Sequence, residues 1–236
     1  MSGTQPLPDA YENYTPVTPF IIDGNALWEV YGIIVQRSEG IGDIPKRKPT
    51  MAVDWEDAHG EAIDLTSVYF ESKEIKLNCW MMATTKLELQ EKFQTFTNAI
   101  MTAGIHRLHI GIDPNSLKPL IYQFYVDDKI TVKKDWYDQV YCYEFNLNLR
   151  EPDPVKRIYR YAASNVSIRA TLTTSKPVNI FWGDGTADYN VVGTSKTVDH
   201  VYGSLGTYFI LVNGEIDSIT SLTFNRTVTL QWTRLI

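Results

Sequence analysis

Alternating apolar and polar residues run through QVYCYEFNLNLREPDP (139–154), and this alternation constrains the fold more than any other feature of the sequence. Its apolar positions are Tyr141, Tyr143, Phe145, Leu147 and Leu149. Since successive side chains of a β-strand point to opposite faces of a sheet, a period of two predicts a strand with one buried face. Comparable runs predict strands within residues 26–36, 50–60, 67–84, 104–112 and 119–136. The chain is therefore expected to be mainly β.

One segment breaks this period. In TTKLELQEKFQTFTNAIMTAG (84–104) apolar residues recur at spacings of three and four, which predicts an amphipathic helix at about 85–103. Thr84 and Thr85 open the segment, Glu88 is a capping-box partner, and Gly104 marks the end. A single helix is expected to flank the strands of the first domain.

The two prolines of REPDPVKR interrupt the strand pattern and place a domain boundary near 152–160. The sequence before residue 20 is rich in Pro, Asp, Asn and Thr and is expected to be an extended arm. The predicted organisation is an arm at 1–19, a first domain at 20–155 and a second domain at 156–236. Short strands and turns without a helix make the second domain an expected β-sandwich of immunoglobulin type.

Charge is distributed unevenly between these parts. Residues 1–155 carry 23 acidic against 14 basic side chains, a net charge of −9, whereas residues 156–236 carry 5 against 8, a net charge of +3. This asymmetry supports two domains and argues against nucleic acid as the main ligand of the first.

The sequence predicts a protein that is made in the cytoplasm and stays there at first. Its N-terminus has neither the basic nor the apolar region of a secretory signal, and no apolar run approaches the roughly 18 residues of a transmembrane span. The two cysteines, Cys79 and Cys142, lie in apolar strand-like runs and are expected to be buried free thiols.

The stretch NIFWGDGTADYN (179–190) is compatible with a catalytic loop, a calcium loop or a structural turn. A calcium loop needs more oxygen ligands at regular spacing than Asp184 and Asp188 supply. VNIFWGDGT followed by VDHVYGSLGTYFILV resembles the PKD-type immunoglobulin-like module. That resemblance implies a tight structural turn that is built from Trp182, Gly183, Asp184, Gly185 and Thr186 and locked by His200 and Tyr202.

In this interpretation Trp182 lies in or near the sandwich core. Gly183 and Gly185 permit the backbone angles of the turn, and the Asp184 carboxylate accepts hydrogen bonds from nearby backbone amides. The stretch is then a turn and carries no catalysis.

The other candidates for chemistry are weak. His106 and His109 have the spacing His-x-x-His, but on a strand they point to opposite faces and lack a third ligand for zinc. Asp54, Glu56 and Asp57 cluster beside Trp55, an arrangement that carboxylates acting on a sugar and solvated surface acids share. We expect no enzyme, no metal site and no cofactor.

A basic cluster lies in RSEGIGDIPKRKPT (37–50), which is predicted to be a long, flexible loop. Two interpretations are open for it, a solvated hairpin and an arm that reaches a neighbouring subunit. In the second, the contact residues are Arg37, Lys46, Arg47 and Lys48.

The first domain resembles the tail-tube-like domain of long-tailed phages, which occurs in tube subunits and in the distal tail protein. PKRKPTMAVDWEDAHGEAIDL followed by ESKEIKLNCWMM is similar to the distal tail protein in particular. The resemblance implies a β-sandwich or rolled barrel with one flanking helix, six copies of which close into a ring around the DNA channel. An acidic domain suits a channel that must pass DNA without binding it.

The resemblance thus implies a structural subunit of a phage or prophage tail, assembled in the host cytoplasm and located in the virion tail. Its expected partners are copies of itself, other tail proteins and host-surface carbohydrate, without specific nucleic-acid binding or membrane insertion. A major tail tube subunit and a cell-surface adhesin or carbohydrate-binding protein stay open as alternatives.

Overall fold

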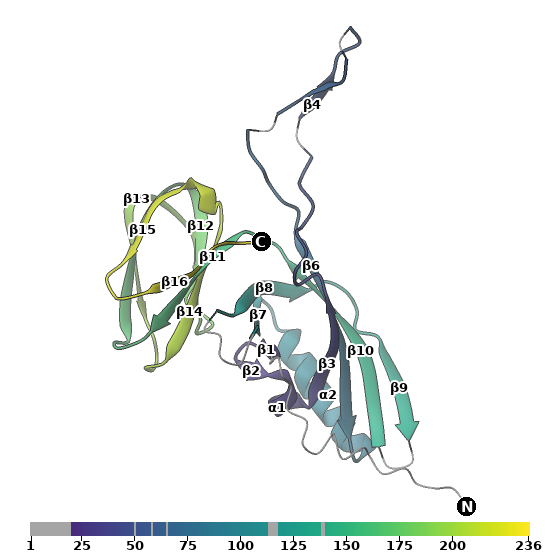
Figure 1. Ribbon diagram of the computed structural model, residues 1–236. Helices are drawn as coiled ribbons and strands as arrows, with labels where there is room; N and C mark the ends of the chain where they lie inside the picture. The colour runs from purple at the N-terminus through teal and green to yellow at the C-terminus, as the bar shows by residue number, and fades with distance from the viewer. Residues whose placement is uncertain (1–19, 50, 58, 65, 113–117, 138–139) are drawn as a thin grey trace, which may run out of the picture.

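The computed structural model describes residues 20–49, 51–57, 59–64, 66–112, 118–137 and 140–236 (Figure 1). The N-terminal arm predicted for residues 1–19 lies outside this range. The described chain is mainly β, as predicted, and its strands gather into two larger sheets and one short two-stranded ladder.

The first part of the chain contains ten of the described strands and both α-helices. The strands are β1 (Phe20–Ile22), β2 (Asn25–Ala26), β3 (Ile33–Glu39), β4 (Ala52–Asp54), β5 (Glu61–Ile63), β6 (Lys73–Ala83), β7 (His106–Ile110), β8 (Leu120–Val126), β9 (Val132–Tyr137) and β10 (Val140–Glu151). The helices are α1 (Leu27–Tyr31) and α2 (Lys86–Ile100). Eight of these strands form one sheet in the order β2-β1-β7-β8-β10-β6-β3, with β9 paired to β10.

Strand β10 is the central element of this sheet and confirms the alternating pattern. It pairs antiparallel with β6 in a register that sets Phe145 opposite Cys79 and Leu147 opposite Leu77. All four of these side chains are buried in one apolar core. The two cysteines are buried free thiols, as predicted.

Helix α2 confirms the predicted amphipathic helix and covers the core face of the sheet. Its N-cap is Thr85, whose hydroxyl accepts a hydrogen bond from Glu88 N at 3.2 Å. Phe96 is fully buried on the core side, where its ring centroid lies 6.0 Å from that of Phe145. The helix contacts β6 and β10, which places the core between helix and sheet.

The strand predicted at 26–36 is wrong in its first half, which forms the short helix α1. Leu27 and Tyr31 are four residues apart and both buried, so they occupy one helical face, while Val30 is 52% exposed. Gly32 ends the helix in the left-handed conformation, with φ 66°, and its N–H returns to the carbonyl of Trp28 at 2.9 Å. After α1, strand structure begins at β3, where Ile33 and Ile34 are both buried.

The second part of the chain forms a six-stranded assembly. Its strands are β11 (Lys156–Ala162), β12 (Ser167–Phe181), β13 (Ala187–Val201), β14 (Thr207–Gly214), β15 (Ile219–Phe224) and β16 (Thr229–Leu235). A 3-10 turn that the sequence did not predict, η1 (Ile216–Ser218), precedes β15.

Strand β12 belongs to both layers of this assembly. Its first half pairs with β15, its second half pairs with β14, and β13 follows it throughout with several register shifts. The strands therefore bend around a single core that includes Trp182, Leu172 and Ile210. This arrangement is a β-sandwich built on one shared strand.

The two parts of the chain pack against each other. Ile121 of β8 is fully buried in a small cluster with Ile158, Phe181 and Leu211 of the second assembly. Trp232 Nε1 also donates to Pro119 O at 3.0 Å. The second assembly thus lies on the β7–β8 side of the first sheet, as Figure 1 shows.

Candidate functional site

A long hairpin, which we call the arm, projects from the body between β3 and β6 (Figure 1). The arm comprises the described residues from 44 to 71. Its outer part is the β4–β5 ladder, and its inner part is held by a bridge between Arg47 and Phe70. Lys48 N donates to Tyr69 O at 2.9 Å, which continues the pairing. These hydrogen bonds keep the hairpin extended, away from the two cores.

The loop predicted over 37–50 is therefore only partly a loop. Arg37 belongs to β3, where its guanidinium pairs with Glu39 at 3.1 Å. The other predicted contact residues lie exposed on the outgoing limb of the arm: Lys46, Arg47 and Lys48. They stand between two prolines but retain backbone N–H and C=O groups, and these pair with the returning limb.

Large apolar side chains are exposed along the arm. The exposed fraction reaches 76% for Met51 and 57% for Trp55. The others are Ile44, Ile63, Val68 and Tyr69. The arm therefore carries several large apolar side chains that neither core covers.

The predicted carboxylate cluster lies at the far end of the same arm. Asp54, Glu56 and Asp57 are all exposed, as is Trp55. The β4–β5 ladder has only two strands, so these acids lie on an open surface, as solvated surface acids do.

The WGDGT turn joins β12 to β13. Gly183 and Gly185 both have positive φ, 96° and 92°, in the region that favours glycine. Trp182 N donates to Thr186 O at 3.1 Å and closes the turn. Asp184 Oδ1 accepts from the backbone N of Thr186 at 3.0 Å and from its hydroxyl at 2.6 Å.

Two side chains at the end of β13 brace this turn. His200 Nε2 lies 2.9 Å from Asp184 Oδ2, and Tyr202 donates its hydroxyl to Trp182 O at 3.1 Å. Partial burial alone would raise the pKa of the Asp184 carboxyl. The hydrogen bonds from Thr186 and the neighbouring His200 outweigh burial, so the pKa lies below its usual value. The carboxylate is therefore a structural acceptor.

The turn also contacts the first sheet, a role that sequence reasoning missed. A Cβ on Gly183 would lie 2.7 Å from Phe209 O and 3.1 Å from Nη1 of Arg107, a β7 residue. Arg107 donates through Nη2 to the same Phe209 carbonyl, and burial lowers the pKa of its guanidinium to about 10. The turn is thus part of the contact between the two halves of the molecule.

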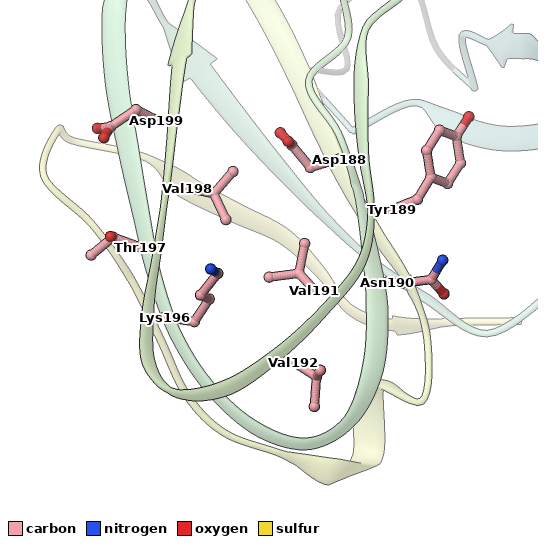
Figure 2. A pocket seen from close by; sticks show the side chains of 9 residues that line it. All are labelled: Asp188, Tyr189, Asn190, Val191, Val192, Lys196, Thr197, Val198 and Asp199. Carbon is pink, nitrogen blue, oxygen red and sulfur yellow. The ribbon is translucent and has the colours of Figure 1, made fainter.

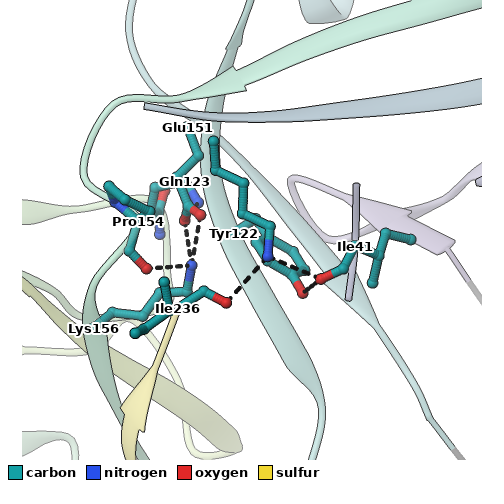
Figure 3. A network of polar contacts seen from close by, with 8 residues as sticks. Ile41, Tyr122, Gln123, Glu151, Pro154, Lys156 and Ile236 are labelled. Atoms are coloured by element: carbon teal, nitrogen blue, oxygen red, sulfur yellow. Dashed lines mark hydrogen bonds and ion pairs between the residues drawn. The ribbon is translucent and has the colours of Figure 1, made fainter. Parts of the chain in front are cut away.

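A network of buried charges lies at the same junction (Figure 3). Lys156 and Glu151 are both fully buried, and Lys156 Nζ lies 2.6 Å from each oxygen of the Glu151 carboxylate. Lys73 is 2% exposed and donates to the carbonyls of Ile41 at 2.9 Å and Ile236 at 3.1 Å. The Tyr122 hydroxyl donates to the same Ile41 carbonyl at 2.8 Å.

Burial, together with the positive charge of Lys156, lowers the pKa of Lys73 to about 8, although the negative charges of Glu151 and Asp43 oppose the shift. The alternating pattern could have located these groups. Glu151 follows Leu149 at the next inward position of β10, and Lys73 precedes Ile75 on the inward face of β6. A charged residue in the apolar series signals a buried ionic contact.

The two histidines of the His-x-x-His spacing, His106 and His109, contact different residues. His106 Nδ1 lies 2.6 Å from Asp23 Oδ2, and Nε2 lies 3.2 Å from Thr102 O. His109 packs edge-to-face on Phe209, and burial lowers its pKa to about 4. Within the part of the chain that the structure describes, no three His, Cys, Asp or Glu side chains are grouped to hold a metal ion.

A cavity of about 590 Å³ lies where β13 curves back on itself, between residues 188–192 and residues 196–199 (Figure 2). Val191 and Val198 face each other across it. Asp188, Lys196 and Asp199 also line it. Asp188 Oδ2 accepts from Trp182 Nε1 at 2.7 Å, so the cavity adjoins the braced turn. The pocket is open to the surface, with two valines beneath and polar side chains around them.

None of the described helices is long and apolar enough to cross a membrane. No protein-family model matches this sequence, and no curated protein does either. Among solved structures, the chain is similar to the SPP1 Dit (gp 19.1) protein, whose crystal structure is described as a paradigm of the hub adsorption apparatus in phages that infect Gram-positive bacteria. The alignment covers 91% of this chain and 97% of that one, with 13% identity and a TM-score of 0.47.

Proposed function

We propose that this chain is a structural subunit of a phage or prophage tail. In this proposal it is a distal tail protein that forms a hexameric ring around the DNA channel and links the tube to the tail tip. The observation that carries the proposal is the arm, a paired hairpin with exposed Met51 and Trp55 at its outer part. A folded chain that extends apolar side chains away from its own core is suited to contact another subunit.

The edges of the first sheet also support ring formation. In the described chain β3 pairs only with β6, and β9 pairs only with β10. Unpaired strand edges promote association, and a closed ring removes them without leaving a free end. We therefore propose that neighbouring sheets join edge to edge through these two strands.

The charge of the first part fits a conduit for DNA. Its net charge of −9 repels phosphate, so DNA would pass without specific binding. The proposed role is non-catalytic, with assembly in the host cytoplasm and final location in the virion tail. Its partners would be further copies of the chain and other tail proteins.

The second assembly is proposed to contact carbohydrate on the host surface. The cavity beside Val191 and Val198 is the place to test for it, since Asp188 and Asp199 can accept hydrogen bonds from sugar hydroxyls. An adhesin would share this property but would not form rings, and a major tail tube subunit would polymerise into long tubes. Assembly behaviour therefore separates the three functions.

The test is light scattering coupled to gel filtration, with and without the tail tube of the same phage. A distal tail protein is expected to give a closed ring of fixed mass, either alone or on the end of the tube. A Lys46/Arg47/Lys48→Glu triple variant is expected to assemble less well. A chain that stays monomeric under both conditions contradicts the ring.

A further inference from the structure

The arm is divided into two halves of opposite charge. Its outer half, the arm tip, is formed by the described residues of 51–64 and contains five acidic side chains and neither Lys nor Arg. They are Asp54, Glu56, Asp57, Glu61 and Asp64. Its inner half, the arm base, contains the basic cluster 46–48, opposed by Glu71.

Within the described chain the charges of the two halves have few partners, and Lys48 of the base acts on the partly buried Asp153, where its positive charge opposes the rise in carboxyl pKa that burial causes. Lys46 Nζ lies 3.8 Å from Glu71 Oε1, but both side chains are exposed, and such a pair contributes little. The tip acids are exposed and repel one another along a narrow ladder. Each half would therefore gain from a partner of the opposite sign.

Each half also exposes apolar surface beside its charges. Met51, Trp55 and Ile63 lie on the tip, and Val68 lies on the base, all at least 37% exposed. Tyr69 of the base is already contacted by Lys176, which donates to its hydroxyl at 2.9 Å. Surfaces that combine apolar side chains with opposite charges fit one another in both respects. The tip and the base are complementary in this sense.

The tip cannot reach the base of its own arm. The β4–β5 ladder pairs the two limbs at the tip, and the hydrogen bond from Lys48 N to Tyr69 O pairs them at the base, so tip and base lie at opposite ends of the arm. At about 3.3 Å per residue, the nine residue steps from Lys48 to Asp57 span at most roughly 30 Å. A compact domain of about 136 residues has a diameter on the order of 35 Å. The tip therefore reaches about as far as an adjacent copy would lie.

We propose that the acidic arm tip of one copy docks on the basic arm base of the next copy. This contact rests on the proposed ring. Each subunit would dock its tip on one neighbour and would accept the tip of the other neighbour on its base. Because the contact joins two different surfaces, each subunit can bind one neighbour through its tip and another through its base. Once the ring closes, every tip and every base is occupied. The charges steer the approach, and the apolar side chains beside them become buried.

Charge reversal of each half tests the contact. The tip variant is Asp54→Lys/Glu56→Lys/Asp57→Lys, and the base variant is Lys46→Glu/Arg47→Glu/Lys48→Glu. Each variant alone would carry like charges on both halves, and its self-association is expected to weaken at least about ten-fold. An equimolar mixture is expected to recover association, because each tip then meets a base of opposite sign.

The control is a Glu29→Lys/Glu91→Lys variant, which alters net charge on two exposed helical positions far from the arm in sequence. It is expected to associate like the unmodified chain. Sedimentation velocity measures association, and circular dichroism verifies that each variant is folded. Native mass spectrometry of the mixture is expected to find equal numbers of the two variants in each ring, because they must alternate.

The outcomes separate this contact from the ring itself. If the unmodified chain forms rings but the mixture associates as weakly as either variant, the tip does not meet the base and the ring stands. If only the base variant is impaired, the base binds something other than the tip, which also overturns the inference. If the unmodified chain associates neither alone nor on the tail tube, the proposed ring fails and this contact fails with it.

Discussion

The imidazole of His200 lies flat against the indole of Trp182, with ring centroids 4.7 Å apart and an interplanar angle of 7°. The same imidazole contacts Asp184 through Nε2, so one side chain connects the core tryptophan with the turn carboxylate. The braced turn is therefore a unit of stability in the second assembly.

Loss of the Asp184 carboxylate should weaken that unit. Asp184→Ala is expected to lower the free energy of unfolding by about 1–2 kcal/mol, because Thr186 N loses its acceptor. Asp199→Ala is the matched control on β13, since its exposed pair with Arg169 should contribute roughly 0–1 kcal/mol. Urea denaturation measures both, and equal effects would contradict a special role for Asp184.

The effect of Asp184→Ala should depend on pH in a fixed direction. The folded-state pKa is lowered, so the carboxylate stabilises the protein above the ordinary Asp pKa of about 4 and loses this contribution as pH falls through the folded value. The difference between the unmodified chain and the variant should therefore shrink in acid.

Substitution by alanine should destabilise the protein more at Gly183 than at Gly185, the two glycines of the turn. Both have positive φ and both would be strained, but a Cβ at Gly185 meets nothing within 4 Å, whereas at Gly183 it meets a backbone oxygen at 2.7 Å. Gly183→Ala is expected to cost about 2 kcal/mol more than Gly185→Ala. Thermal unfolding compares them, and a reversed order would show that the close approach to Phe209 is not rigid.

The stability of the protein should rise between about pH 8 and pH 10. Lys73 has a folded pKa of about 8, below the unfolded value, so in this range the unfolded chain binds a proton that the folded chain has lost. Lys73→Met should abolish this part of the rise, while Lys76→Met, at an exposed position of the same strand, should retain it. Denaturation at several pH values distinguishes the two variants.

Removal of one partner of the buried Glu151–Lys156 pair should destabilise the protein more than replacement of both partners by apolar residues. Lys156→Met leaves the Glu151 carboxylate buried without its closest partner, at a cost of about 3–5 kcal/mol. The double variant Glu151→Leu/Lys156→Met should be more stable than Lys156→Met alone. If the two variants are equally unstable, the junction depends on packing rather than on charge.

Local patterns predicted the elements that depend on local physics. The alternation of β10 and the three-and-four spacing of α2 each follow from which face is buried. The same reasoning failed at α1, where five residues are too few to distinguish the two periods and Gly32 ends the helix.

The contacts of the junction depend on tertiary packing and could not be predicted in the same way. Nothing adjacent to Gly183 in the sequence indicates that Arg107 lies beside it, because the two residues meet only when the second assembly packs on β7. The arm was predicted only in part, as a loop over 37–50 that could be a solvated hairpin or an arm to a neighbouring subunit. Its length could not be predicted, because it depends on the pairing of Arg47 with Phe70 and on the β4–β5 ladder.

Ile121 belongs to a strand of the first sheet, yet its side chain is enclosed by Ile158, Phe181 and Leu211 of the second assembly. Unfolding of either half would therefore expose buried apolar side chains of the other to water. The two halves should unfold in one cooperative transition rather than as independent domains. A load applied to one end of the molecule would be transmitted through this joint instead of being absorbed by a hinge.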